Sequence, residues 1–226
     1  MSKIAIGLPL VGDLPMECVA DVMISAAQAS VEADLIVIAP QGIFPHDRAR
    51  ETIITEALSA GCDYLWFIDA DTRQPKGAIK EMLRVLNEEK AAMVTGWYNQ
   101  RGFPFASTWA IERKIGDVKI ADTMQIVPKD ADRVKISGCG LGSALIDLRW
   151  VRENLKPPFF VMTPAPGKIT MFLWEDAYFC CLIRDAGGRV FGLPQIQCIH
   201  MGRRREITGA NEQQLRKDFI EGSLLV

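Results

Sequence analysis

Short apolar runs alternate with amphipathic segments through the first hundred residues. The continuous apolar runs cover residues 4–10, 35–39, 64–68 and 92–95. Between them, apolar positions recur at helical spacing over residues 18–31, 49–60 and 75–89. Such runs separated by helices are typical of parallel strands that are covered on both faces. The pattern therefore predicts a Rossmann-like α/β sheet with right-handed crossover connections.

The second half of the chain has a more mixed pattern. Residues 105–111, 118–127 and 134–136 resemble strands or hairpins, and a glycine-rich turn, GCGLG, follows at residues 138–142. Residues 155–168 are rich in Pro and Gly and predict a loop. A helix is expected over residues 175–186, closed by Gly187 and Gly188, with short strands at 190–193 and 196–199. The predicted fold class is α/β, with a mostly parallel central sheet flanked by helices and a mixed C-terminal half.

Composition narrows the functional classes. A chain of 226 residues fits one domain, and a formal net charge of -2 excludes the broad basic field that is typical of nucleic-acid binding. No run of 18 apolar residues exists, so no membrane span is expected. The six cysteines show no CxxC spacing and lie mostly among apolar neighbours, which predicts reduced thiols and a cytoplasmic protein.

The triplet Asp69-Ala70-Asp71 directly follows the apolar run at residues 64–68. In α/β sheets, ligands bind at the carboxyl ends of the strands, which is where this triplet falls. Two carboxylates beside a buried strand need a counter-charge, and a divalent cation can supply it. Magnesium and manganese take oxygen ligands from carboxylates and from substrate phosphates. The alternative is a polar turn in which Asp71 caps the helix that begins near Pro75.

Five segments resemble the motifs of GT-A-fold glycosyltransferases, especially the family-two-like group found in bacteria and phages. Residues 63–72, DYLWFIDADT, resemble the strand and DxD motif, and residues 48–50, RAR, resemble the ARN segment, with Glu51 where Asn is usual. Residues 138–146 are similar to the GTGxxxLI acceptor-side loop, and residues 174–180, WEDAYFC, to the EDxxFC helix start. Residues 188–202 are similar to the closing stretch that ends in HxG. Order and spacing hold from about residue 4 to residue 202.

The resemblance implies one GT-A catalytic domain over residues 1–202. Its nucleotide-sugar-binding half would cover residues 1–96, its acceptor half residues 97–202, and a C-terminal tail residues 203–226. The implied enzyme is a hexosyl- or pentosyltransferase that moves a sugar from a nucleotide-sugar, a UDP- or GDP-sugar first, to an acceptor hydroxyl. In the family, the DxD motif and a late His share the metal. Asp69, Asp71 and His200 are therefore the implied ligands of Mn²⁺ or Mg²⁺, with Asp71 the firmer and Asp69 near the ribose or the metal.

The family also implies a set of donor-binding residues. They are Pro9, Leu10, Val11, Arg48, Arg50, Asp69, Ala70 and Asp71. Pro9 to Val11 fall where the family places the nucleotide base. Arg48 and Arg50 would contact the base or the phosphates, for which bidentate donors are suited. The alternative for these two arginines is a solvated helix N-terminus.

Glu175 and Asp176 open the helix predicted at residues 175–186. Acids at this end also interact favourably with the helix dipole, which is the structural alternative. Adjacent helical residues diverge by about 100°, so at most one should face the pocket. In inverting relatives the Asp of this pair is the general base for the acceptor hydroxyl, which makes Asp176 the candidate, while a retaining enzyme need not use it. The implied acceptor-binding residues, which core packing or a turn would also explain, are Trp97, Tyr98, Gly140, Leu141, Gly142 and Trp174.

Several assignments stay open. His46 matches no family motif and is expected to be structural or on the surface. Arg203 to Arg205 could close over the diphosphate, form a solvated tail or contact nucleic acid; some phage relatives modify DNA bases, so a modified DNA base is one acceptor to consider. A sugar-phosphate nucleotidyltransferase is disfavoured because residues 8–13, LPLVGD, hold one Gly and no basic residue. A non-catalytic nucleotide- or sugar-binding module is the third alternative, and the sequence gives no oligomeric state.

Overall fold

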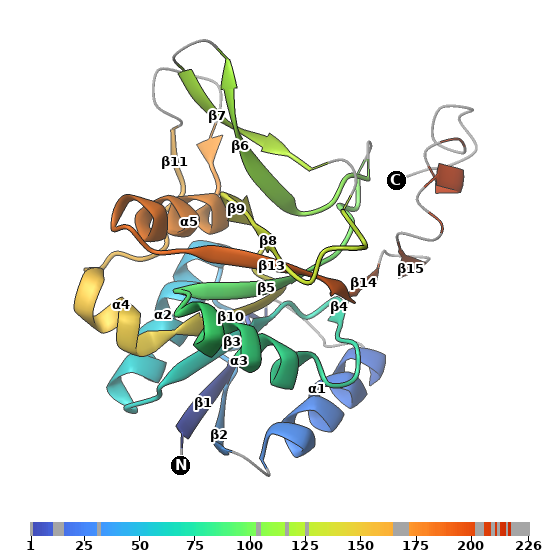
Figure 1. Cartoon of the computed structure of the whole chain (residues 1–226). Helices are drawn as coiled ribbons and strands as arrows, with labels where there is room; N and C mark the ends of the chain where they lie inside the picture. The colour runs from blue at the N-terminus through green and yellow to red at the C-terminus, as the bar shows by residue number, and fades with distance from the viewer. Residues whose placement is uncertain are drawn as a thin grey trace.

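The structure is a computed structural model that describes residues 2–10, 16–30, 33–102, 105–115, 118–124, 127–164, 172–201, 206–208, 211, 213–215 and 217. Within these residues a seven-stranded sheet forms the centre, with the strand order β2-β1-β3-β10-β5-β13-β8 (Figure 1). The strands are β1 (Ser2–Gly7), β2 (Ala33–Ile38), β3 (Tyr64–Ile68), β5 (Met93–Trp97), β8 (Val134–Lys135), β10 (Ser143–Asp147) and β13 (Val190–Gln197).

The central sheet is mixed. The pairs β1–β2, β1–β3 and β5–β13 are parallel, whereas β10 is antiparallel to both β3 and β5, and β8 is antiparallel to β13. The predicted α/β class with a mostly parallel sheet is therefore correct. Since the parallel strands all point the same way, their carboxyl ends at Gly7, Ile68, Trp97 and Gln197 lie along one edge.

One element of the sheet differs from the sequence expectation. The resemblance places residues 138–146 in an acceptor-side loop, but residues 143–147 form β10, which separates β3 from β5 in the middle of the sheet. Its residues Ala144, Leu145 and Ile146 are completely buried, so the apolar stretch is explained by this central position. The short helix α4 (Leu148–Asn154) follows directly, and Asp147 caps it by accepting hydrogen bonds from the backbone N–H groups of Arg149 and Trp150.

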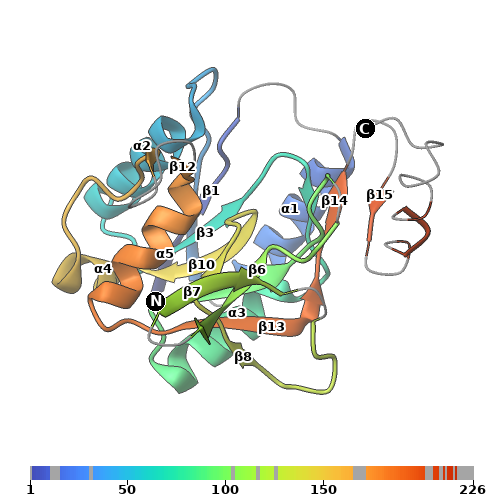
Figure 2. The same ribbon diagram turned by 90° about the horizontal axis from the view of Figure 1, so that it is seen from above.

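Helices cover both faces of the sheet. The helices α2 (His46–Ser59), α4 and α5 (Glu175–Asp185) contribute to one apolar cluster, which also includes Leu65 and Phe67 of β3. The helices α1 (Met16–Ala29) and α3 (Ala78–Glu89) contribute to the other, which includes Trp66 and Ile68. Figure 2 shows the two groups on opposite sides of the sheet. Because alternate residues of a strand point to opposite faces, this two-sided burial explains why β3 is apolar throughout.

Three smaller β-structures lie around the central sheet. The strand β4 (Thr72–Arg73) pairs antiparallel with β14 (Ile199–Met201), which also pairs with β15 (Glu206–Ile207). The hairpin β6 (Trp109–Ile115) and β7 (Val118–Thr123) pairs with β9 (Gly138–Cys139) and projects from the body in Figure 1. The strands β11 (Thr163–Pro164) and β12 (Phe172–Leu173) form a short antiparallel pair ahead of α5. None of the described helices is long and apolar enough to cross a membrane.

The close approach of the β6–β7 hairpin to the sheet depends on Gly192. A Cβ atom at this position would lie 2.4 Å from a ring carbon of Trp109, which is fully buried. We expect Gly192→Ala to lower the free energy of unfolding by about 1–3 kcal/mol, because the buried indole must shift. Chemical denaturation measures this change. Gly138→Ala is the control, since its Cβ would meet only the Cβ of Ala110 at an ordinary 3.7 Å; an equal loss in both variants would contradict the packing argument.

Candidate functional site

A cavity of about 450 Å³ opens at the carboxyl edge of the parallel strands. Eight of its ten lining residues are predicted site residues, namely Pro9, Arg50, Asp69, Ala70, Asp71, Tyr98, Glu175 and His200. The other two are His46 and Arg101. Residues from both predicted halves of the chain thus line one cavity, and Asp69, Ala70 and Asp71 form part of its wall.

Hydrogen bonds fix the shape of the acidic turn. The backbone N–H of Asp69 donates to the carbonyl of Gly142 at 3.3 Å, and that of Thr72 donates to the carbonyl of Asp69 at 3.0 Å. The buried amide of Gln74 donates to the carbonyls of Thr72 and Gly142 and accepts from the hydroxyl of Ser143 at 2.6 Å. Gln74 therefore ties the turn after β3 to the loop before β10.

The pairing of β4 with β14 brings His200 to Asp71. His200 lies opposite Thr72 in this register, and the backbone N–H of Met201 donates to the carbonyl of Asp71 at 2.7 Å. The imidazole Nε2 of His200 is consequently 3.6 Å from Oδ1 of Asp71. Residues that are more than 120 positions apart in the sequence are thus held together by a two-strand contact rather than by side-chain packing alone.

The tautomer of His200 follows from its other ring nitrogen. Nδ1 lies 2.8 Å from the backbone carbonyl of Asn99, which can only accept, so Nδ1 carries the hydrogen and Nε2 has the lone pair, which accepts from Nε of Arg101 at 2.9 Å. Burial lowers the pKa of His200, which keeps the ring neutral at pH 7. The ring of Tyr98 packs edge-on against the imidazole at 5.1 Å. A neutral, oriented imidazole beside a carboxylate is the form that binds a metal ion.

The described residues contain no group of three or more His, Cys, Asp or Glu side chains that could hold a metal ion. The carboxylate of Asp71 and the imidazole of His200 form a two-ligand set, and Asp69 is engaged elsewhere. Hard cations in phosphate-binding sites often take only one or two carboxylates and complete their coordination with substrate oxygens and water. The pair therefore fits a divalent cation that binds together with a phosphate-bearing ligand.

Arg50 provides the positive charge next to the carboxylates of Asp69 and Glu175. Its side chain is 6% exposed, its Nη2 donates to Oδ1 of Asp69 at 2.8 Å, and its Nε is 3.8 Å from Oε1 of Glu175. The guanidinium also lies over the ring of Phe67. Among the described residues, Nε and Nη1 of Arg50 are buried and make no hydrogen bond. Buried donors are normally satisfied, and Arg50 lines the cavity, so these two N–H groups are candidate donors to a ligand there.

The two acids at the start of α5 occupy different positions. Glu175 is buried, lines the cavity and faces Arg50. Asp176 is not among the lining residues, and its Oδ1 accepts a hydrogen bond from the backbone N–H of Ala177 at 2.6 Å. Burial raises the pKa of Asp176 to about 6, although the charge of Arg50 opposes the shift. A carboxyl group that titrates near neutrality suits proton transfer.

The glycines at 140 and 142 allow close packing against Tyr98. A Cβ at Gly140 would lie 2.6 Å from the Tyr98 hydroxyl oxygen, and one at Gly142 would lie 2.7 Å from it and 2.9 Å from Oδ2 of Asp69. The backbone N–H of Gly142 donates to that hydroxyl oxygen at 2.9 Å. In the structure these glycines and Tyr98 therefore shape the wall next to Asp69.

The remaining predicted site residues do not line the cavity. Trp97, Leu10 and Leu141 are buried, and the indole N–H of Trp97 donates to the carbonyl of Pro194. Arg48 is exposed on α2, two residues from Arg50. Trp174 is 61% exposed directly before the two acids of α5. Val11 and Arg203 to Arg205 lie outside the described residues.

Arg101 and His46 are the two site residues that the sequence did not indicate. Nη2 of Arg101 contacts Oδ2 of Asp71, and its Nε donates to Nε2 of His200 at 2.9 Å. His46 begins α2 at the cavity mouth, where it is exposed. Neither residue belongs to a motif. One sequence feature could have indicated Arg101 as a site residue. It follows β5 by four residues and so lies near the carboxyl edge of the sheet, where the other cavity residues lie.

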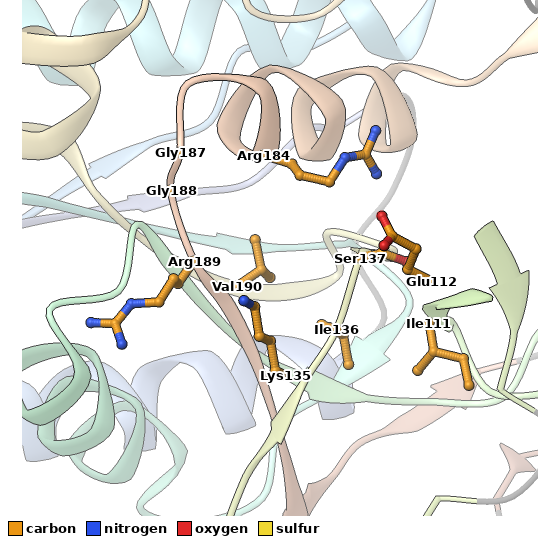
Figure 3. Close-up of a pocket in the computed structure, with 10 residues that line it drawn as sticks. All are labelled: Ile111, Glu112, Lys135, Ile136, Ser137, Arg184, Gly187, Gly188, Arg189 and Val190. Atoms are coloured by element: carbon orange, nitrogen blue, oxygen red, sulfur yellow. The ribbon is translucent and has the colours of Figure 1, made fainter. Parts of the chain in front are cut away.

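A second cavity, of about 520 Å³, lies by the C-terminal end of α5 (Figure 3). Its charged lining residues are Glu112, Lys135, Arg184 and Arg189. Figure 3 shows the Arg189 guanidinium turned away from the other side chains, and its Nη1 lies 3.4 Å from Glu89. Glu112 is the single carboxylate among the described lining residues, so this cavity has no counterpart of the Asp71–His200 pair. The smaller, acidic cavity is the better candidate for chemistry.

Comparisons with known proteins bear on the fold of the chain. Comparison with protein-family models finds no match, and comparison with curated proteins also finds none. Among solved structures, the chain is similar to A197 from STIV, with a TM-score of 0.61 and 18% identity over 92% of this chain and 94% of that chain. It is also similar to GalNAc-T7 with UDP, GalNAc and Mn²⁺, with a TM-score of 0.57 and 11% identity. The second match covers 98% of this chain and 50% of that chain.

The likeness shows the class of fold. GalNAc-T7 is a GT-A glycosyltransferase, and the chain shares its arrangement of a large mixed sheet flanked by helices. The chain therefore has a GT-A-like fold, and the cavity lined by Asp69, Asp71 and Glu175 lies at the carboxyl edge of the sheet, where ligands bind in α/β folds.

Arg50 is expected to be essential for stability because Asp69 and Glu175 lose their counter-charge without it. We predict that Arg50→Met lowers the free energy of unfolding by about 2–4 kcal/mol, since a broken buried pair leaves an uncompensated charge. Urea denaturation at pH 7 measures the loss. Arg48→Met, an exposed arginine on the same helix, should change stability little. If both variants are as stable as the wild type, Arg50 does not neutralise the cluster.

Proposed function

We propose that the chain is a metal-dependent glycosyltransferase, a hexosyl- or pentosyltransferase that moves a sugar from a nucleotide-sugar to an acceptor hydroxyl. The observation that carries the proposal is the Asp71–His200 pair, with a neutral imidazole lone pair 3.6 Å from a carboxylate oxygen at the carboxyl edge of a GT-A-like sheet. Mn²⁺ or Mg²⁺ is the cation that this donor set suits. The structural neighbour GalNAc-T7, which carries UDP, GalNAc and Mn²⁺, supports the same class of donor.

Different residues of the cavity would bind different parts of the donor. Asp71 and His200 would hold the cation, which when bound offsets the charge on the departing diphosphate. Nε and Nη1 of Arg50, buried and unbonded among the described residues, would donate to oxygens of the donor. Asp69 is positioned by Arg50 and by the backbone carbonyl of Gly142, so we assign it to the ribose or sugar side of the cavity rather than to the cation. Pro9 and Ala70 complete the wall.

The proton of the acceptor hydroxyl needs a base. Asp176 is our candidate, because its raised pKa of about 6 leaves it ionised at pH 7 yet basic enough to accept a proton. Glu175 lines the cavity itself and balances Arg50, so we assign it a positioning role. In an inverting reaction Asp176 would take the proton as the oxygen attacks the anomeric carbon and the diphosphate leaves. A retaining reaction would not require this step.

We assign Trp174 to the acceptor side of the site. Its indole is 61% exposed and directly precedes Glu175, and an exposed aromatic face suits a sugar ring or a base. A modified DNA base is among the acceptors to test, although the net charge of -2 gives no general attraction to DNA. A cytoplasmic location accords with six thiols and no disulfide, all of them in described residues.

Two other functions are less well supported. A sugar-phosphate nucleotidyltransferase would need basic residues on the loop after the first strand, and residues 8–13, LPLVGD, contain none. A non-catalytic binding module would not need an oriented imidazole, a buried arginine with unbonded donors and a carboxyl group of raised pKa in one place. The transferase accounts for all three.

The donor is testable without knowing the acceptor. With Mn²⁺, the protein should slowly hydrolyse at least one member of a panel of UDP- and GDP-sugars, because water can replace the acceptor. Asp71→Ala should reduce the rate on the order of 100-fold or more, as expected for a lost metal ligand. Asp132→Ala, at an exposed carboxylate remote from the cavity, is the control. No hydrolysis and no binding of any donor would refute the transferase.

The pH profile tests the base. Because ionised Asp176 is the reactive form, kcat/KM for transfer should rise about tenfold per pH unit up to about pH 6 and then level. Asp176→Asn should lower kcat by about 100-fold or more and remove this limb, whereas Asp185→Asn, near the exposed end of the same helix, should do neither. Near-normal transfer by Asp176→Asn would exclude the role, and loss of the limb in Glu175→Gln alone would transfer it to Glu175.

A further inference from the structure

Arg101 fills the position between the two proposed metal ligands. Its Nη2 contacts one carboxylate oxygen of Asp71, and its Nε donates to Nε2 of His200 at 2.9 Å. The other oxygen of Asp71 lies 3.6 Å from the same Nε2. A single cationic side chain thus bridges the carboxylate and the imidazole.

These contacts use the same lone pairs that a metal ion would use. Nε2 of His200 has one lone pair, since Nδ1 carries the hydrogen that is donated to the carbonyl of Asn99. That lone pair cannot accept from Arg101 and bind a cation at the same time. Electrostatics adds to the exclusion, because a guanidinium and a divalent cation repel each other at contact distance.

The two arginines of the cavity differ in how firmly they are held. The side chain of Arg50 is 6% exposed and lies over Phe67, whereas that of Arg101 is 49% exposed. Arg50 can leave its carboxylates only by unpacking the core. Arg101 can turn away from Asp71 into solvent or into the cavity that it lines.

We propose that Arg101 is a built-in competitor for the divalent cation, which neutralises Asp71 while the cation is absent and must be displaced when it binds. The proposal rests on the proposed function, because it assumes a cation at Asp71 and His200. A nucleoside diphosphate then helps the exchange, since it offers the displaced guanidinium a new anionic partner in the same cavity. Cation and nucleotide should therefore bind cooperatively, each raising the affinity of the other by the same factor.

Direct measurement of Mn²⁺ binding by electron paramagnetic resonance tests this competition without any catalytic assay. Arg101→Gln should bind Mn²⁺ alone about tenfold more tightly than the wild type, because the carboxylate and the imidazole are no longer occupied. With UDP present the difference should shrink, since the wild-type guanidinium then has its alternative partner. Arg84→Gln, which removes an exposed arginine from ion pairs on α3, should leave Mn²⁺ binding unchanged.

The outcomes separate this proposal from the one on which it rests. Equal or weaker Mn²⁺ binding by Arg101→Gln, with binding still abolished by Asp71→Ala, would overturn the competition and leave the metal site in place. Binding that is insensitive to Asp71→Ala in both backgrounds, or absent from both, would overturn the metal site as well. Thermal unfolding of each variant confirms that the compared proteins are folded. Competition also predicts that Mn²⁺ and UDP raise each other's affinity by a smaller factor in Arg101→Gln than in the wild type.

Discussion

Carboxylates gathered at the carboxyl end of β3 impose the constraint on which the site depends, because each buried negative charge needs a positive partner. Asp69 and Glu175 share Arg50, and Asp71 contacts Arg101. Arg50 is fixed in place, since its side chain is buried on α2 against Phe67 of β3 and Glu175 of α5. The contact of Arg101 with Asp71 is exchangeable, since Arg101 is half-exposed. We propose that the guanidinium of Arg101 occupies the position that a metal ion and its phosphate ligand would take.

The fold places these charges through backbone pairing. The turn after β3 is hydrogen-bonded to the loop before β10 through Gln74 and Gly142, and β4 pairs with β14 to set His200 opposite Thr72. Such contacts hold the segments that carry Asp71 and His200 together through the backbone. Preorganised groups need little rearrangement when charge develops on a substrate, which is how electrostatic catalysis works. The arrangement therefore accords with the proposed chemistry on a diphosphate.

Local pattern was enough to predict the first strands and helices, since their residues bury apolar faces on both sides of one sheet. It also placed Asp69 and Asp71 at a strand end, and the family motifs added His200, Glu175 and Asp176. The local pattern could not predict that β10 lies between β3 and β5, because the order of strands is set by contacts between distant segments. The sequence did not indicate Arg101 and His46 as site residues for the same reason. The role of an isolated basic residue in a loop or at a helix start depends on the side chains that the fold places beside it.

The most direct test of the account is the position of a bound metal. Crystals grown with Mn²⁺ and UDP, measured at a wavelength that gives manganese anomalous scattering, would locate it. We expect a peak within bonding distance of the Asp71 carboxylate, of Nε2 of His200 and of the diphosphate, with the Arg101 guanidinium withdrawn from both side chains. A peak elsewhere, or a diphosphate bound in this cavity with Arg101 still bridging Asp71 and His200, would contradict it.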